Sequence, residues 1–232
     1  MFKFIYIALI FLLIVIIAFA GWKFRGKRNS HKTKKENSIL ELALEKSGAF
    51  SGKQVMFFGD SQIALWPMQS SFGVLPIINR GISGDFVTKC RKRFSDEVSS
   101  LKPDLIILLI GANDLNAGVS TREIIKHIQI LIEEGKNANA EIVICSLLPV
   151  SPEVANNGRP VSSIIKINNA LSGICHKEEL GFVDFHNSLL DENGFFDEQF
   201  SDDGLHPNKD GYFVMSGIIL PYITNLFDEK GQ

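Results

Sequence analysis

The sequence predicts an α/β fold in which a parallel sheet is covered by helices on both faces. Short apolar runs alternate along the chain with longer segments whose apolar residues recur every three or four positions, which is the pattern of repeated βαβ units. The clearest run, LIILLIG at residues 105–111, lies between Pro103 and the polar pair Asn113 and Asp114. A short apolar run without alternation is typical of a parallel strand buried on both faces.

The expected elements follow one another in a regular order. Strands are expected at residues 53–59 (KQVMFFG), 75–80 (LPIINR), 105–111 (LIILLIG), 141–148 (EIVICSLL) and 181–185 (GFVDF). Helices are expected at 38–47, directly after Asp60, and at 88–101, 121–134, 161–178 and 208–227. Because crossovers between parallel strands are right-handed, this order predicts a three-layer α/β/α, flavodoxin-like domain with a five-stranded parallel sheet.

The N-terminal part of the chain differs in composition from the rest. Residues 4–22 are 19 residues without a charge, and a helix of that length at ~1.5 Å per residue is about long enough to cross a bilayer core of ~30 Å. We therefore expect a transmembrane helix or signal-anchor at 1–22, a basic linker at 23–37 and a globular catalytic domain at 38–232.

Two features disagree about the side of the membrane on which this domain lies. Ala18-Phe19-Ala20 follows the apolar core as a signal-peptide cleavage site does, which favours export. The segment 23–35 carries seven Lys and Arg residues, whereas only Lys3 and the terminal amine precede the span. A basic flank stays cytoplasmic. We expect an uncleaved single-pass membrane anchor, and the side of the catalytic domain stays open.

Composition excludes some classes of partner and site. A net charge of −2 over 232 residues gives no reason to expect nucleic acid as a partner. Cys90, Cys145 and Cys175 are far apart and form no C-x-x-C pair, so we expect small core residues rather than a zinc site or a disulfide framework. The sequence predicts neither a cofactor nor a metal ion.

Polar residues follow three of the expected strands at the point where each ends. Ser61 follows the first strand, Gly81 ends the segment Asn79-Arg80-Gly81 after the second, and Asn113 follows the third. A fourth polar cluster, residues 201–207, precedes the last helix. Because ligands of parallel α/β sheets bind outside the carboxyl ends of the strands, we expect these residues to meet in one site.

These residue types have the chemistry of acyl transfer. A serine becomes a nucleophile when a histidine takes its proton and a carboxylate orients that histidine. Ser61, His206 and Asp203 fit these roles, since Asp203 and His206 are three residues apart on one loop. The negative oxygen that forms on the substrate needs preorganised donors, for which the Ser61 and Gly81 backbone N–H groups and the Asn113 side-chain amide are candidates.

Together these segments resemble the GDSL, or SGNH, hydrolase family. The matching blocks, in chain order, are GDS at 59–61, Gly81 within NRGISGD, GAND at 111–114 and DGLHP at 203–207. The resemblance spans roughly residues 53–228, and within the family it is nearest to the platelet-activating-factor acetylhydrolase-like and lysophospholipase-like esterases. One departure is Gln62, where the family signature has Leu.

The resemblance implies a serine esterase that cleaves small acyl esters, including lipid or acetylated-sugar esters, through an acyl-enzyme. It implies Ser61 as nucleophile, His206 as general base and then acid, and Asp203 as the residue that orients His206. Ser61, Gly81 and Asn113 would form the oxyanion hole. The expected partners are a small acyl-ester substrate and, through the N-terminal helix, a membrane.

Several alternatives stay open from the sequence. The same triad can serve an acyltransferase, a metal-dependent phosphoesterase could use Asp60, Asn113, Asp114 and His206 as ligands, and a silent binding domain needs no nucleophile at all. Ser61 could instead cap a helix. Asp202 rivals Asp203, and His186 lies near the same edge of the sheet. Four apolar residues in loops near the site are candidates for an acyl pocket as well as for core packing: Trp66, Met68, Phe72 and Val154.

Overall fold

The computed structural model describes residues 52–228 of the chain. Its centre is a five-stranded sheet in the order β2-β1-β3-β4-β5, in which every neighbouring pair of strands is parallel. The strands are β1 (Val55–Gly59), β2 (Ile77–Gly81), β3 (Leu105–Leu109), β4 (Glu141–Cys145) and β5 (Gly181–Val183). The strand order reverses between β1 and β3, which is where such sheets open a crevice for ligands.

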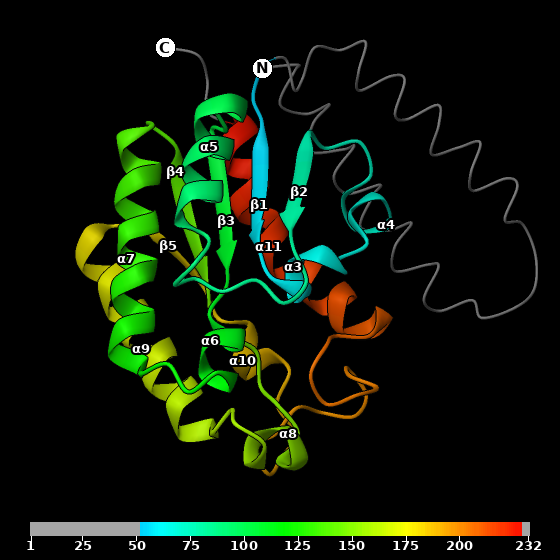
Figure 1. Ribbon diagram of the computed structural model, residues 1–232. Helices are drawn as coiled ribbons and strands as arrows, with labels where there is room; N and C mark the ends of the chain where they lie inside the picture. Colours follow the sequence, from blue (N-terminus) through cyan, green and yellow to red (C-terminus); the bar gives the residue numbers. More distant parts are fainter. Residues whose placement is uncertain (1–51, 229–232) are drawn as a thin grey trace, which may run out of the picture. The chain divides into compact units, whose positions relative to one another are not determined.

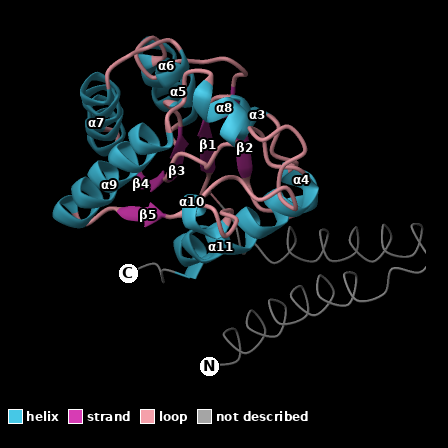
Figure 2. Ribbon diagram, turned by 90° about the horizontal axis from the view of Figure 1, so that it is seen from below, coloured by secondary structure: helices cyan, strands magenta, loops and turns pink. Residues whose placement is uncertain are grey.

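Helices cover both faces of this sheet, as Figure 1 and Figure 2 show. One layer consists of α5 (Arg91–Leu101), α7 (Thr121–Asn137) and α9 (Val161–Glu178). The other is built on α11 (Lys209–Asp228), with α4 (Met68–Phe72) and α10 (Phe185–Ser188). Side chains of β1 alternate between the layers, because Met56 and Phe58 pack in the first core and Val55 and Phe57 in the second. The fold is therefore the predicted three-layer α/β/α arrangement.

Three further short helices lie at loops that follow strands: α3 (Ser61–Ala64), α6 (Ala112–Asn116) and α8 (Pro152–Asn156). Of the short helices only the one after Asp60 was predicted, because four or five residues are too few to show an amphipathic repeat. The third strand was predicted to reach Gly111, but it ends at Leu109 and Gly111 precedes α6 with a φ of 123°. This positive φ lets the chain turn sharply from strand to helix.

The longer elements agree closely with their predicted ranges, and α9 begins and ends at the predicted residues. Cys90, Cys145 and Cys175 are free thiols buried in the two cores, as expected. Burial raises the pKa of the Cys90 thiol to about 12, so that it stays protonated at neutral pH.

The predicted membrane span at 4–22, the domain boundaries at 22 and 37 and the expected helix at 38–47 lie outside the described residues. Within residues 52–228, no helix is long and apolar enough to cross a bilayer.

Candidate active site

Ser61 is the first residue of α3, directly after β1 ends at Gly59. Asp60 caps this helix, because its Oδ1 accepts the Gln62 backbone N–H at 3.0 Å. Gly59 is required at the turn, since a Cβ there would lie 2.1 Å from the Leu109 carbonyl oxygen and 2.6 Å from Ile63 Cγ1. The tight turn leaves Ser61 half-buried at the sheet edge.

His206 reaches Ser61 from the loop before α11. Its Nε2 lies 2.9 Å from Ser61 Oγ, and its Nδ1 lies 2.7 Å from Asp203 Oδ2. The loop is closed on Asp203, whose Oδ1 accepts the backbone N–H groups of Leu205 at 2.9 Å and His206 at 2.7 Å. With Nδ1–H donated to the carboxylate, Nε2 is left to accept the serine proton. The structure thus brings together the three residues predicted as the triad.

Asp203 is held in its charged form. Burial opposes that charge, but hydrogen bonds from the His206 backbone and ring and from the Leu205 backbone outweigh it and lower the pKa of Asp203 to about 2. Asp202, the rival candidate, points elsewhere and accepts a hydrogen bond from Asn208 Nδ2 at 3.1 Å. The D-x-x-H spacing therefore pointed to Asp203, the carboxylate that faces His206.

A second set of contacts ties α3 to the histidine loop. Gln62 Nε2 donates to the Leu205 carbonyl oxygen at 2.8 Å, and Tyr212 Oη donates to the Gln62 carbonyl oxygen at 2.8 Å. Gln62 is the residue that departs from the GDSL signature, and it is buried. The Gln62 side chain therefore links α3 to the loop that carries His206.

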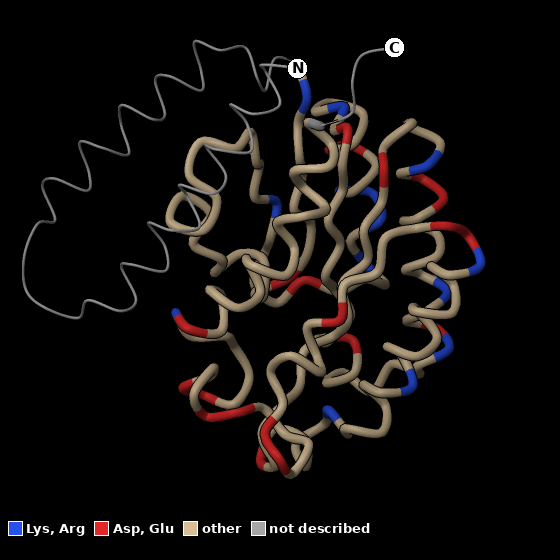
Figure 3. Tube along the Cα trace, turned by 180° about the vertical axis from the view of Figure 1, so that it is seen from behind, with Lys and Arg blue, Asp and Glu red and all other residues tan. Residues whose placement is uncertain are grey.

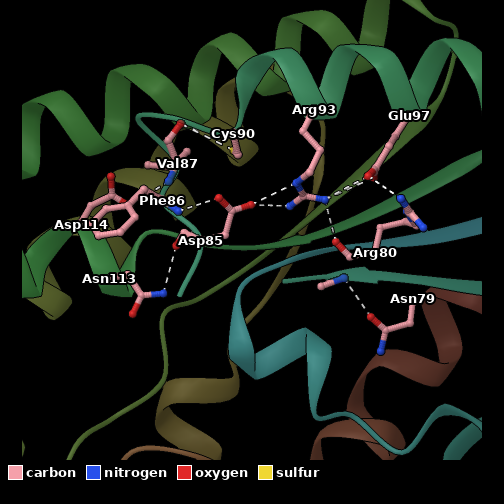
Figure 4. Close-up of polar contacts among 11 residues, drawn as sticks. Asn79, Arg80, Asp85, Phe86, Val87, Cys90, Arg93, Glu97, Asn113 and Asp114 are labelled. Atoms are coloured by element: carbon pink, nitrogen blue, oxygen red, sulfur yellow. Dashed lines mark hydrogen bonds and ion pairs between the residues drawn. The ribbon is translucent and has the colours of Figure 1, made fainter. Parts of the chain in front are cut away.

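Asp114 explains why an amide and a carboxylate stand side by side after β3. The Asp114 carboxylate is fully buried and accepts the backbone N–H groups of Val87 at 2.8 Å and Thr88 at 3.1 Å, together with the Thr88 hydroxyl at 2.7 Å. It therefore fastens the loop after β2 to α6 (Figure 4). Asn113, one residue earlier, faces the same loop and donates from Nδ2 to the Asp85 carbonyl oxygen at 3.0 Å.

The loop after β2 is also held by charge. Arg93 of α5 donates to Asp85 Oδ2 from Nε at 3.1 Å and from Nη2 at 2.5 Å, and its guanidinium lies 3.9 Å from the centre of the Phe58 ring. Arg93 also contacts Glu97, which pairs with Arg80 (Figure 4). Asp85 is therefore anchored through its side chain while its carbonyl oxygen positions Asn113.

The backbone N–H of Gly81, predicted as an oxyanion donor, already has a partner in the structure. Its N–H donates to Asn79 Oδ1 at 2.9 Å, so it is not available to an oxyanion. A Cβ at Gly81 would lie 2.2 Å from the Ala64 backbone nitrogen, and the glycine thus serves the close approach of β2 to α3. Three residues on, Gly84 has a φ of 79° and open space at the Cβ position. Among the described residues its N–H has no hydrogen-bond partner.

The apolar residues considered for an acyl pocket belong to the cores. Trp66 and Phe72 are buried in an aromatic cluster with Phe57, where the Trp66 ring lies 5.3 Å from that of Phe57. Met68 and Val154 are partly buried against the two cores. His186 is buried after β5, and its backbone N–H donates to Ser146 Oγ. Trp66, Phe72 and His186 are therefore enclosed by the fold rather than open to a ligand.

The side chains considered as metal ligands have other partners in the structure. In the part of the chain that the structure describes, no three His, Cys, Asp or Glu residues are grouped to hold an ion. Asp114 is saturated by the loop amides, and Asp60 caps α3. Burial of Asp60 raises its pKa from the ordinary value to about 6, against the opposing effects of the Gln62 backbone N–H and of Arg159.

Asp85, Gly84 and Arg159 also lie at this site, although the sequence did not identify them as site residues. The signal for Asp85 and Gly84 was present in the segment NRGISGD, where a glycine precedes a carboxylate in a loop that follows a strand. Arg159 Nη2 donates to Asn113 Oδ1 at 2.9 Å across 46 residues of sequence. No local pattern marks a contact of that reach.

The chain matches one protein family over most of the described residues. A profile of the GDSL-like lipase/acylhydrolase family matches residues 57–213. A comparison with curated proteins gives no significant match.

Solved structures share the fold. A GDSL-like lipase from Bacteroides thetaiotaomicron superposes with a TM-score of 0.69 at 24% identity, covering 82% of this chain and 97% of that one. An acetylxylan esterase from Geobacillus stearothermophilus, in a catalytic mutant form, gives 0.61 at 19% identity, covering 75% and 94%. A candidate acylhydrolase from Bacteroides fragilis gives 0.71 at 20% identity, covering 87% and 100%.

Proposed function

Since this chain belongs to the GDSL-like lipase/acylhydrolase family, and is thereby an enzyme that acts on carboxylic ester bonds, we propose that it is a serine esterase with Ser61 as its nucleophile. The observation that carries the proposal is the chain of contacts from Ser61 Oγ to His206 Nε2 at 2.9 Å and from His206 Nδ1 to Asp203 Oδ2 at 2.7 Å. This is the arrangement in which an imidazole can take a serine proton while a carboxylate stabilises the resulting charge.

In the first half of the reaction Ser61 Oγ attacks the ester carbonyl carbon and its proton passes to His206 Nε2. The tetrahedral intermediate collapses as the bond between carbon and the alcohol oxygen breaks, and His206 returns the proton to the leaving alcohol. The acyl group is then bonded to Ser61. In the second half His206 takes a proton from water, the hydroxide attacks the acyl carbon, and Ser61 regains its proton as the carboxylic acid leaves.

The oxyanion of both intermediates needs donors aimed at the end of β1. Ser61 N–H begins α3, and Asn113 Nδ2 has a second hydrogen besides the one given to Asp85. We assign the third donor to Gly84 N–H in place of Gly81, because the Gly81 N–H is occupied and the Gly84 N–H is open beside the carbonyl that holds Asn113. Loss of one such donor from an enzyme of this kind costs about 10²- to 10³-fold in kcat.

The proposed substrates are neutral esters of short acyl groups, such as acetyl esters. Trp66, Met68 and Phe72 pack in the core rather than around Ser61, which favours a short acyl chain. Residues 191–203, which end at Asp203 of the triad, contain six Asp and Glu with no Lys or Arg, and Figure 3 shows acidic residues gathered on loops at the bottom of the view. A negative surface repels anionic substrates and so favours uncharged ones.

The test is hydrolysis of p-nitrophenyl acetate and p-nitrophenyl octanoate by the full-length protein, its Ser61→Ala variant and the control Ser162→Ala. Ser162 is an exposed serine of α9, so its loss leaves the rate unchanged. We expect Ser61→Ala to remove essentially all activity and the acetate to be cleaved with the higher kcat/KM. A folded Ser61→Ala variant with the wild-type rate would refute the serine mechanism, and preference for octanoate would refute the short acyl chain.

A further inference from the structure

Arg159 is a buried cation directly behind the oxyanion side of the site. It lies in the connection between α8 and α9, and only 7% of its surface is exposed. Gly158 before it packs against Asn116 of α6, where a Cβ would come within 3.2 Å of Asn116 Oδ1. Burying a guanidinium costs free energy unless nearby groups compensate it. The position of Arg159 therefore calls for a role that uses its charge.

The contacts of Asn113 show what that charge does. Arg159 Nη2 donates to Asn113 Oδ1 at 2.9 Å, while Asn113 Nδ2 donates to the Asp85 carbonyl oxygen at 3.0 Å. An amide with a cation at its oxygen has only one orientation, because the flipped amide would direct N–H groups at the guanidinium. One N–H of Asn113 is therefore fixed on Asp85, and the other is left for a ligand.

The guanidinium also acts on the amide electronically. A positive charge at Oδ1 draws electron density from nitrogen, which makes the remaining N–H a stronger donor to a negative oxygen. The compensation for burying Arg159 is incomplete, because its Nε has no hydrogen-bond partner in the described chain. The nearby Asp60 carboxyl interacts with it electrostatically, and that attraction opposes the rise in the Asp60 pKa caused by burial. The guanidinium charge therefore acts on the site mainly through the Asn113 amide, whose Oδ1 it contacts.

We propose that Arg159 is a positioning residue of this esterase that fixes and polarises the Asn113 amide for the oxyanion. The inference rests on the proposed function, since it assigns Arg159 to the same reaction at Ser61. A positioning role differs from a purely structural role of Arg159 in one respect. A positioning residue acts through Asn113 and so has nothing to act on when the Asn113 amide is absent.

A double-mutant cycle tests this dependence. We would measure kcat and KM for p-nitrophenyl acetate in wild type, Arg159→Met, Asn113→Ala and the double variant. We expect Arg159→Met to lower kcat about 10- to 100-fold with little change in KM, somewhat less than the loss of the Asn113 donor itself. In the Asn113→Ala background the same substitution is expected to change kcat by no more than about two-fold. Arg122→Met, at an exposed position of α7, is the matched control with the wild-type rate.

Two results would overturn the inference: wild-type kcat in a folded Arg159→Met variant, or equal effects of Arg159→Met in both backgrounds. If Arg159→Met does not fold, Arg159→Gln carries the same cycle, because it keeps a donor for Asn113 Oδ1 and removes only the charge. Its kcat is expected to lie between those of Arg159→Met and wild type. A retained rate in Ser61→Ala would instead refute the proposed function, whereas an inactive Ser61→Ala with a neutral Arg159→Met refutes this inference alone.

Discussion

The two sides of the site, that of Ser61, Asp203 and His206 and that of the proposed oxyanion donors, are held by contacts that differ in how far apart the partners lie in the sequence. Asp203 and His206 sit within four consecutive residues, and their side chains are 55% and 27% exposed. On the oxyanion side Asn113 is bound by Asp85 and Arg159, which are 28 and 46 residues away in sequence, and the neighbouring Asp114 is fully buried. The Asp203–His206 pair is a local motif on an accessible loop, whereas the proposed oxyanion donors depend on three distant segments packing together.

This difference predicts two kinds of sensitivity. Changes on the triad side should lower the rate far more than they lower stability, because the loop is exposed and closed by its own hydrogen bonds. Changes on the oxyanion side should lower both rate and stability, because they leave buried polar groups without partners.

Asp203→Asn is expected to give the largest loss, about 10³- to 10⁴-fold in kcat, because an amide can no longer stabilise the imidazolium or hold the tautomer that leaves Nε2 free. The unfolding free energy at pH 7 should fall only modestly, because the charge that the lowered pKa of Asp203 reports is more than half exposed to solvent. Steady-state kinetics and urea unfolding measure the two effects. The control is Asp202→Asn, which should keep the wild-type rate; an equal loss in both variants would contradict the assignment of Asp203.

Asp114→Asn is expected to lower kcat about 10- to 100-fold and to destabilise the fold by about 1–3 kcal/mol. An amide in place of the carboxylate cannot accept from Val87, Thr88 N–H and Thr88 Oγ together, so the loop that carries Gly84 and Asp85 loosens. Kinetics and thermal unfolding beside the exposed control Asp96→Asn check this. Wild-type stability with wild-type kcat would remove the contrast between the two sides of the site.

Gln62→Leu, which restores the family signature, is expected to lower kcat only a few-fold, by about 2- to 10-fold. It removes the hydrogen bond to the Leu205 carbonyl oxygen but leaves the Tyr212 contact to the backbone and the closed loop around Asp203 in place. The result is measured as kcat for p-nitrophenyl acetate. A loss as large as that of Asp203→Asn would show that the histidine loop depends on a long-range contact after all.

Asp60→Asn is expected to have the smallest effect on kcat and a clear effect on the pH dependence of stability. Because the folded pKa of Asp60 is raised from 3.8 to about 6, its contribution to stability is complete below pH 3.8 and is lost as the pH rises through about 6. At about 1.36 kcal/mol per pKa unit, the difference amounts to about 3 kcal/mol. Urea unfolding between pH 4 and pH 8 should show wild type losing stability relative to Asp60→Asn by up to this amount, and a constant difference would contradict the raised pKa.

The same difference in sequence separation between contacting residues explains how much the sequence alone could predict. The sheet, its flanking helices and the meeting of Ser61, Asp203 and His206 were predicted, because periodicity and the D-x-x-H spacing are local. The oxyanion side was predicted only in part. Asn113 was identified by its place after β3. Gly81 was the glycine predicted as a donor and Gly84 was not considered, because the sequence does not show that the Asn79 side chain takes the Gly81 N–H. Arg159 could not be found, since its contact with Asn113 exists only once α6 and the α8–α9 connection pack together.

The central claim, that His206 activates Ser61, is tested most directly by labelling the full-length protein with a fluorophosphonate and locating the adduct by mass spectrometry. Wild type, Ser61→Ala, His206→Ala and the exposed control His176→Ala would be compared. If His206 activates Ser61, a single adduct is expected on the peptide that contains Ser61, lost in Ser61→Ala, strongly reduced in His206→Ala and unchanged in His176→Ala. No adduct in folded wild type, or labelling that persists in Ser61→Ala, would contradict it.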